Sequence, residues 1–233
     1  MKRIIKISLI LLLVGMAVIA AVPFLKEKRA EKKYENDFKK IQESVTEKKS
    51  DVNGLVKKNK DCIGYVEIPG TTISYPVMQT KDKPDFYLNH DFNRNYSFYG
   101  TPYLSAYCDV EKSDNLIIYG HNINGGKMFG ALEQYKDKEF FYKHRKIYFT
   151  TDKKREYEVF AVMSVNIHEF EYWKFVMARD AKEYDEFVDK VEEHSLWRQG
   201  NKPKYGEQML MLSTCDNGKG DDWRIVVIGK MVV

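Results

Sequence analysis

One cysteine in the sequence stands at the end of a strongly apolar segment. Residues Met209–Leu212 are followed by Ser213, Thr214 and Cys215. An apolar strand that ends in small polar residues presents its last side chain at the edge of a scaffold, where reactive groups are commonly placed. A thiol in that position acts as a nucleophile once it is deprotonated. The alternative is a buried structural thiol, because free cysteine is among the most buried residue types.

An arginine begins the apolar segment that follows. Arg224 lies nine residues after Cys215. If residues 216–222 connect two antiparallel strands, Cys215 and Arg224 are expected side by side. A guanidinium group beside a thiol favours the thiolate and donates hydrogen bonds to a developing oxyanion.

His121 is the histidine best placed to exchange protons with such a nucleophile. It follows the apolar segment Leu116–Tyr119 and Gly120, so it is also expected at a strand end. Taken alone, it is equally an ordinary turn residue. The other four histidines have polar or charged neighbours and are expected at the surface: His90, His144, His168 and His194. Cysteine, histidine and arginine at three strand ends together predict nucleophilic catalysis with a general acid and base.

These motifs resemble the signature of the sortases, the cysteine transpeptidases of Gram-positive bacterial surfaces. The resemblance covers residues 61–233, and its motifs are Tyr119-Gly120-His121-Asn122, Leu212-Ser213-Thr214-Cys215 and the downstream Arg224. Sortases usually have Thr-Leu-x-Thr-Cys, and here Met211 replaces the leading threonine. The N-terminal helical extension, a predicted helix over Ala181–Trp197 and the segment Tyr87-Leu88-Asn89 resemble class B sortases.

The resemblance implies a reaction and its partners. Cys215 is expected to attack a Thr–Asn or Thr–Gly bond in a sorting signal that resembles Asn-Pro-x-Thr-Asn/Gly, while His121 protonates the leaving amine. Arg224 would donate hydrogen bonds to the oxyanion. The implied partners are surface proteins that carry the signal and an amine of the cell-wall peptide, which accepts the acyl group. Asn89, Ser213 and Thr214 are weaker candidates for substrate contact, since each would equally brace the barrel.

Two other functions fit the same residues. One is a hydrolytic cysteine peptidase, and the other is a membrane-tethered binding module in which Cys215 is only structural. Metal binding is a weaker interpretation: no Cys-x-x-Cys or His-x-x-x-His spacing accompanies Cys215, His121 and Asp216 as zinc ligands. Asp216, Asp221 and Asp222 lack the spacing of a calcium loop and are expected in a solvated turn. We therefore expect neither a metal nor a cofactor.

Residues 1–25 predict an uncleaved membrane anchor. Lys2, Arg3 and Lys6 precede the uncharged segment Ile7–Leu25. As a helix, these 19 residues would be about 28 Å long, close to the thickness of a bilayer core. Counting lysines and arginines on both sides favours a cytoplasmic body. The sortase resemblance implies the opposite, a single-pass protein at the cell membrane with an extracellular catalytic domain.

Residues 26–60 predict a charged helical stalk, with Tyr34, Phe38, Ile41 and Val45 on a narrow apolar stripe. The blander interpretation is a helix or two that lies against the following domain. The stalk has 12 basic and seven acidic residues and the anchor has three basic residues, so the net charge of +4 leaves −4 for residues 61–233. A nucleic-acid-binding domain is usually basic, and we therefore exclude nucleic acid as a partner.

Residues 61–233 predict a mainly β domain with peripheral helices. Eight short apolar segments indicate an eight-stranded, closed or nearly closed barrel: Cys62–Ile68, Ile73–Met78, Tyr103–Tyr107, Leu116–Tyr119, Lys146–Thr150, Tyr157–Val165, Gln208–Thr214 and Ile225–Val233. Helices are expected over Met128–Tyr142 and Ala181–Trp197. Cys62 and Cys108 would be able to pair in an exported protein, but two buried thiols are the preferred interpretation.

Overall fold

The computed structural model describes residues 52–232 without a gap. Of residues 1–51 it describes 6, 12, 15–17, 19–26, 28–29, 32–33, 35–36 and 39, all in helical conformation. The chain divides into two compact units, Met1–Ser44 and Val45–Val233. Among the described residues, no helix has both the length and the apolar character needed to cross a membrane. Much of the predicted anchor and of the predicted stalk lies outside the described residues, so both stay predictions.

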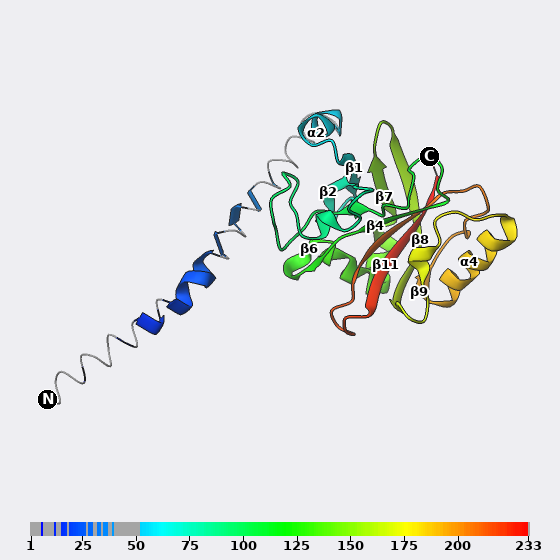
Figure 1. Cartoon of the computed structure of the whole chain (residues 1–233). Helices are drawn as coiled ribbons and strands as arrows, with labels where there is room; N and C mark the ends of the chain where they lie inside the picture. Colours follow the sequence, from blue (N-terminus) through cyan, green and yellow to red (C-terminus); the bar gives the residue numbers. More distant parts are fainter. Residues whose placement is uncertain are drawn as a thin grey trace. The chain divides into compact units, whose positions relative to one another are not determined.

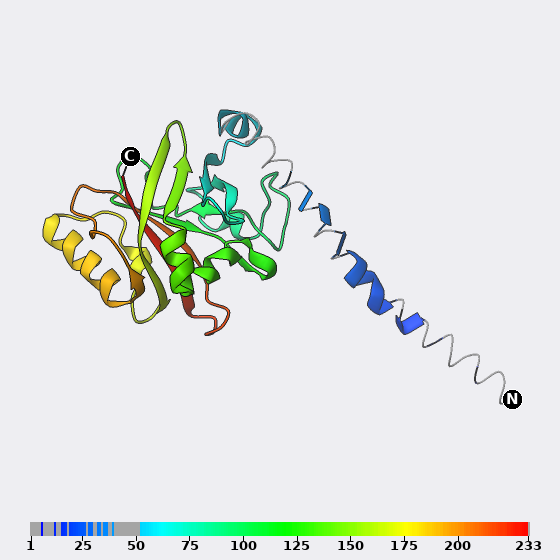
Figure 2. The ribbon, with the colours of Figure 1, turned by 180° about the vertical axis from the view of Figure 1, so that it is seen from behind.

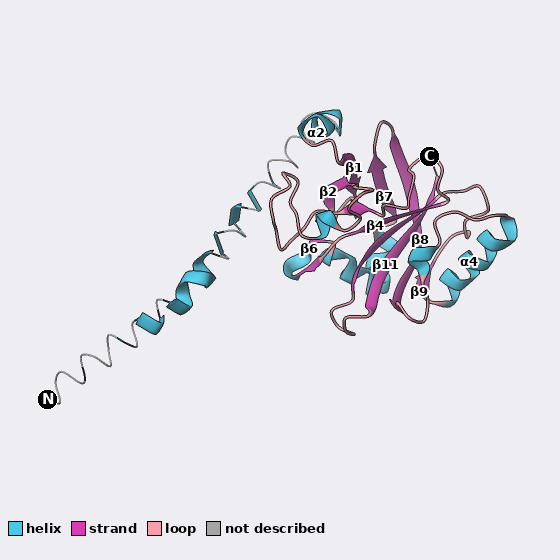
Figure 3. Cartoon of the chain, in the orientation of Figure 1, coloured by secondary structure: helices cyan, strands magenta, loops and turns pink. Residues whose placement is uncertain are grey.

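Eight strands of the second unit close into a barrel (Figures 1 and 3). Their order is β11-β10-β4-β3-β2-β1-β7-β8, and pairing of β11 with β8 completes the circle. The bounds are Cys62–Glu67 for β1, Ser74–Met78 for β2, Tyr103–Leu104 for β3, Asn115–Tyr119 for β4, Lys146–Thr150 for β7, Lys154–Asn166 for β8, Met209–Cys215 for β10 and Trp223–Met231 for β11. The predicted eight-stranded barrel is confirmed.

Three further strands lie outside the closed circle. β9 (Ser195–Arg198) pairs with the second half of β8. β5 (Asn122–Ile123) and β6 (Lys127–Met128) form a separate two-stranded sheet directly after β4, joined by the single turn η2 (Asn124–Gly126). The chain therefore leaves the barrel immediately after the end of β4.

β10 and β4 are buried along almost their whole length. Residues 209–214 of β10 and 115–118 of β4 are all buried. Such continuous burial is typical of a strand covered on both faces, in contrast to the alternating pattern of a half-exposed strand. The two strands run parallel, with Leu210 opposite Leu116 and Ser213 opposite Tyr119. Each fully buried leucine contributes about 1.5–3 kcal/mol of transfer free energy.

Helices of the second unit lie on the outside of the barrel (Figure 2). α2 (Val52–Lys58) packs on β1 through the buried Val52 and Leu55, as expected for a stalk helix that lies against the domain. The single-turn helices η1 (Phe86–Leu88) and η4 (Tyr172–Lys174) lie in the long connections between strands.

Both long helices expected from the sequence are shorter than predicted. The helix expected over Met128–Tyr142 is instead the 3-10 helix η3 (Gly130–Lys136) followed by α3 (Lys138–Lys143). Asp137 separates them, because its extended backbone and side chain cap the N-terminus of α3.

The helix expected over Ala181–Trp197 is wrong at its end. α4 spans Ala181–Glu193, with Asp180 as its N-cap, and the residues that follow form β9. Pairing of Trp197 with Val162 of β8 and a hydrogen bond from its indole to the Lys136 carbonyl outweigh the local helical pattern. Tertiary contacts commonly override such a local preference.

The two aspartate caps give a prediction for stability. Asp137→Ala and Asp180→Ala each remove the acceptor for a helix N-terminal N–H, from Phe140 and Glu183 respectively. Each variant is expected to lower the free energy of unfolding by about 1 kcal/mol, measured by urea denaturation. Asp137→Asn retains an acceptor and serves as the control. Equal losses for the alanine and asparagine variants would show that the cap is not the cause.

Candidate active site

Cys215 and Arg224 face each other across the last pair of the β10–β11 ladder. The antiparallel register places Thr214 opposite Ile225 and Cys215 opposite Arg224, which confirms the predicted pairing. Cys215 is half-buried, in contrast to the six buried residues before it in β10.

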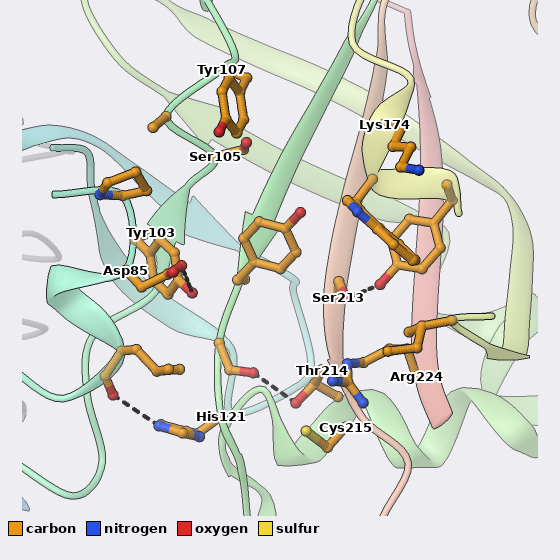
Figure 4. A pocket seen from close by; sticks show the side chains of 18 of the residues that line it. Asp85, Tyr103, Ser105, Tyr107, His121, Lys174, Ser213, Thr214, Cys215 and Arg224 are labelled. Atoms are coloured by element: carbon orange, nitrogen blue, oxygen red, sulfur yellow. Dashed lines mark hydrogen bonds between the residues drawn. The ribbon is translucent and has the colours of Figure 1, made fainter. Parts of the chain in front are cut away.

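The guanidinium group of Arg224 is held by the loop that connects the two strands. Its Nη1 donates to the carbonyls of Asp221 at 2.6 Å and Trp223 at 2.9 Å. Figure 4 shows the group directed toward Cys215. A guanidinium has five N–H donors, so anchoring Nη1 leaves donors on Nε and Nη2 for a substrate.

His121 lies beyond the end of β4, beside the strand that carries Cys215. Two hydrogen bonds join the strands at this point: the Gly120 N–H donates to the Ser213 carbonyl at 3.1 Å, and the Thr214 hydroxyl donates to the Gly120 carbonyl at 2.7 Å. Gly120 is required here, because a Cβ atom would lie 2.7 Å from the ring of Phe129. Parallel pairing thus brings His121 and Cys215, distant in sequence, to the same end of the barrel.

The imidazole of His121 is oriented by a backbone carbonyl. Nε2 lies 2.8 Å from the carbonyl oxygen of Leu88, visible as a dashed line in Figure 4. A carbonyl only accepts hydrogen bonds, so Nε2 is the donor and carries a hydrogen. The neutral ring therefore has its free lone pair on Nδ1. Phe98 stacks parallel to the ring, with centroids 6.4 Å apart.

These side chains open onto one cleft of about 1030 Å³. It is lined by the three candidate catalytic residues together with Gly120, Ser213, Thr214, Pro84, Asp85, Leu88, Tyr103, Ser105, Ala106, Tyr107, Tyr119, Ile167, Tyr172, Trp173, Lys174 and Val176. Cys215, His121 and Arg224 lie together at one end of the view in Figure 4.

The weaker candidates differ in their placement. Ser213 and Thr214 line the cleft but are buried. The Ser213 hydroxyl lies 2.7 Å from the Tyr172 hydroxyl, and the Thr214 hydroxyl is bonded to Gly120. Both hydroxyls therefore brace the fold, and substrate contact stays a prediction for each. Asn89 is exposed directly after η1, outside the set of residues that line the cleft, and its role also stays a prediction.

Buried tyrosines make the wall beside Ser213 apolar and neutral. Burial raises the pKa of Tyr172 to about 12. Burial also raises the pKa of Tyr119 and of Tyr103, and the carboxylate of Asp85 adds to the shift of Tyr103. These phenols stay protonated at neutral pH, and the hydroxyls of Tyr172 and Tyr103 already form hydrogen bonds with Ser213 and with Asp85.

Asp216 contradicts the expectation of a solvated turn. It is fully buried, while Asp221 and Asp222 are exposed. Its carboxylate accepts from Lys136 Nζ at 2.5 Å and from the Ser164 hydroxyl at 2.6 Å. Burial alone would raise the pKa of Asp216, but these hydrogen bonds outweigh it and hold the pKa below its usual value. Asp216 is therefore a charged structural group directly after Cys215.

Some features of the site have no signal in the sequence. The Leu88 carbonyl is a backbone group, and no side-chain pattern predicts its approach to His121. Trp173 and Lys174 contribute a wall of the cleft from an irregular segment. The sequence also gave no prediction for Tyr172. The adjacent aromatic residues Tyr172 and Trp173, in a segment without periodicity, are only a weak indication that this segment lines a cleft.

The comparisons with known proteins agree with this geometry. Residues 66–232 match the sequence model of the sortase domain. Sortase B of Listeria monocytogenes is 32% identical over 189 residues, covering 80% of this chain and 76% of that protein. Sortase B of Staphylococcus aureus is 28% identical over 242 positions, covering 100% and 98%.

Solved structures extend the similarity to three dimensions. The structure titled Staphylococcus aureus sortase B-substrate complex has a TM-score of 0.78 at 26% identity, covering 87% of this chain and 97% of that chain. Clostridium perfringens sortase B has a TM-score of 0.73 at 28% identity, covering 78% and 99%.

The chain belongs to the sortase family. Its relatives and structural neighbours are class B sortases, and it is accordingly a class B, sortase-type transpeptidase.

The three cysteines give a prediction for thiol reactivity. Cys62 and Cys108 are buried and unpaired, as preferred from the sequence, and burial raises their pKa values to about 12 and about 11. Both thiols therefore stay protonated and shielded at pH 7, whereas Cys215 is half-exposed. Iodoacetamide is expected to label only Cys215 in the native protein and all three cysteines in denaturant. Peptide mapping by mass spectrometry measures this, and native labelling of Cys62 or Cys108 would contradict it.

Proposed function

We propose that this protein is a membrane-anchored sortase that cleaves a sorting signal resembling Asn-Pro-x-Thr-Asn/Gly after its threonine and transfers the surface protein to a cell-wall amine. The observation that carries the proposal is that Cys215, Arg224 and His121 line one end of the same cleft. The structural neighbour titled as a sortase B-substrate complex supports a substrate of the sortase type.

The first half of the reaction forms a thioester. In the reactive form, the Nδ1 nitrogen of His121 has taken the proton of the Cys215 thiol. The resulting thiolate attacks the threonine carbonyl carbon, and its sulfur bonds to that carbon while the carbonyl oxygen becomes an oxyanion. The free N–H donors of Arg224 stabilise this oxyanion. The C–N bond then breaks, and His121 gives a proton to the leaving amine. The product is an acyl group on Cys215 and a free C-terminal fragment.

The second half transfers the acyl group. An amine of the cell-wall peptide attacks the thioester carbon and loses a proton to His121. The C–S bond breaks, a new amide forms and the thiolate of Cys215 is regenerated. The Leu88 carbonyl holds Nε2 as a donor, so Nδ1 is the nitrogen that exchanges the proton in both halves. No metal or cofactor takes part in this scheme.

The scheme predicts which substitutions stop the reaction. Cys215→Ala is expected to abolish cleavage of a sorting-signal peptide, because no other group supplies the nucleophile. Arg224→Lys is expected to lower kcat by about 10²–10³-fold, the loss typical of an oxyanion donor. Cys62→Ala and Cys108→Ala are the controls and retain cleavage. Product masses with and without an amine measure the reaction, and substantial cleavage by Cys215→Ala would contradict the scheme.

The same product analysis separates transfer from hydrolysis. With an amine present, the expected product is the amide of that amine. A product that carries water in its place, at every amine concentration, would assign the protein to hydrolytic peptidases that use the same residues.

The proposed location is the cell membrane, with a single N-terminal span and an extracellular catalytic domain. Its support is the uncharged segment 7–25 together with the family. Deleting residues 1–25 is expected to release a soluble enzyme with unchanged peptide cleavage, while the full chain sediments with membranes. Protease added to intact cells is expected to degrade the domain. A folded but inactive truncated protein would show that the segment does more than anchor.

A further inference from the structure

Asn122 occupies the point at which the His121 segment separates from the Cys215 strand. In a parallel ladder, alternate N–H groups of one strand donate to alternate carbonyls of the other. After the Gly120 N–H, which donates to Ser213, the next donor would be the Asn122 N–H and the next acceptor the Cys215 carbonyl. The chain instead enters the β5–β6 sheet, where Asn122 lies opposite Met128 and the Phe129 N–H donates to the His121 carbonyl. The paired register of β4 and β10 therefore ends at Tyr119 and Ser213, two residues before His121 and Cys215.

The side chain of Asn122 replaces the missing ladder bond. Its amide Nδ2 donates to the Cys215 carbonyl at 2.7 Å and also to Oε1 of Glu133 at 2.7 Å. Both hydrogens of the amide are thus used. The side-chain amide of Asn122 extends further from the backbone than a backbone N–H does. Its bond to the Cys215 carbonyl therefore holds the two backbones at a wider spacing than a ladder bond would. Asn122 itself is outside the residues that line the cleft.

Charged residues of η3, together with Asp216 directly after β10, hold this amide in place. Glu133 pairs through its other oxygen with Lys136 at 2.7 Å, and Lys136 also contacts Asp216 at 2.5 Å. Asp216 is fixed to β8 by Ser164. Asp216 follows Cys215 directly in the chain. The contacts therefore form a closed circuit, which runs from the Cys215 carbonyl through Asn122, Glu133 and Lys136 to Asp216 and returns through the backbone. We call this circuit the ring.

We propose that Asn122 is a positioning residue that sets the spacing between His121 and Cys215, with Glu133, Lys136 and Asp216 holding its amide. The inference rests on the proposed roles of Cys215 and His121. Its physical basis is that proton transfer and nucleophilic attack require the two groups at a defined separation, and misplacement by about 1 Å costs on the order of 10²-fold in rate.

The experiment compares Asn122→Ala with Gln208→Ala in the full chain. Gln208 is a matched control, because its side-chain amide also donates to two carbonyls, those of Val110 and Ser113, just before the opposite end of β10. Asn122→Ala is expected to lower kcat at least about tenfold and to leave KM within about twofold, as for a group that acts on the transition state alone. Gln208→Ala is expected to lower thermal stability and to leave kcat unchanged. A kcat of Asn122→Ala within twofold of the parent would overturn the proposal.

Glu133 provides a test of the ring itself. Glu133→Gln keeps an oxygen that accepts from Asn122 and is expected to retain kcat within about threefold, whereas Glu133→Ala loses more. Because Glu133 acts through Asn122, Asn122→Ala combined with Glu133→Ala is expected to be no slower than Asn122→Ala alone. If the kcat losses of the two single variants multiplied in the double variant, or if KM rose at constant kcat, Glu133 would not act through Asn122.

A measurement that needs no turnover separates this inference from the proposed function. Hydrogen exchange reports the Gly120 and Asp216 amides, whose N–H groups donate to Ser213 and Trp223. Asn122→Ala is expected to speed both about tenfold by loosening the strand ends, and Gln208→Ala is not. If the parent chain cleaves no sorting-signal peptide, the proposed function fails, and exchange alone decides about Asn122. Unchanged exchange would overturn the tie between the strand ends, and faster exchange would uphold it.

Discussion

The parallel pairing of β4 with β10 is the contact on which the site depends. Parallel strands end at the same edge of a sheet, so the register of Ser213 opposite Tyr119 fixes where His121 and Cys215 emerge. β11 then adds Arg224 by antiparallel pairing with β10. The three candidate catalytic side chains lie at or just beyond the ends of three adjacent strands, and burial of β4 and β10 on both faces makes that arrangement rigid.

The proposed reaction also depends on where the pairing of β4 with β10 ends, which is after Gly120. A ladder that continued to Cys215 would draw the backbone of His121 against β10. The chain instead diverges after Gly120, where Phe129 packs closely on the backbone, and enters the small β5–β6 sheet. The cleft is continued by tyrosines whose burial raises their pKa values and keeps them neutral. In the proposed reaction, this wall of low polarity strengthens electrostatic interactions with an oxyanion compared with those in water.

Much of this organisation could be predicted from the sequence, because the signals for it lie within short segments of the chain. Apolar segments bounded by polar residues predicted the strands, and the short loop between Cys215 and Arg224 predicted their antiparallel pairing. The pairing of β4 with β10 is not local, because nothing in either segment specifies the other as its parallel neighbour. Strand-end positions and the family resemblance predicted that His121 acts with Cys215, but not the pairing that brings them together. The errors have the same origin. A solvated turn was expected for Asp216, because its partners Lys136 and Ser164 are distant in sequence. The end of α4 was predicted too late, because Trp197 pairs with β8 instead of continuing the helix.

The account centres on a covalent intermediate at one sulfur atom, and mass spectrometry tests it most directly. The full chain is mixed with a sorting-signal peptide in the absence of an amine, denatured in acid within seconds and digested. The account predicts that the N-terminal peptide fragment, ending at its threonine, is attached through a thioester to Cys215 and is released when an amine is added before denaturation. Turnover with an adduct on another residue, or with Cys215 unmodified throughout, would contradict it.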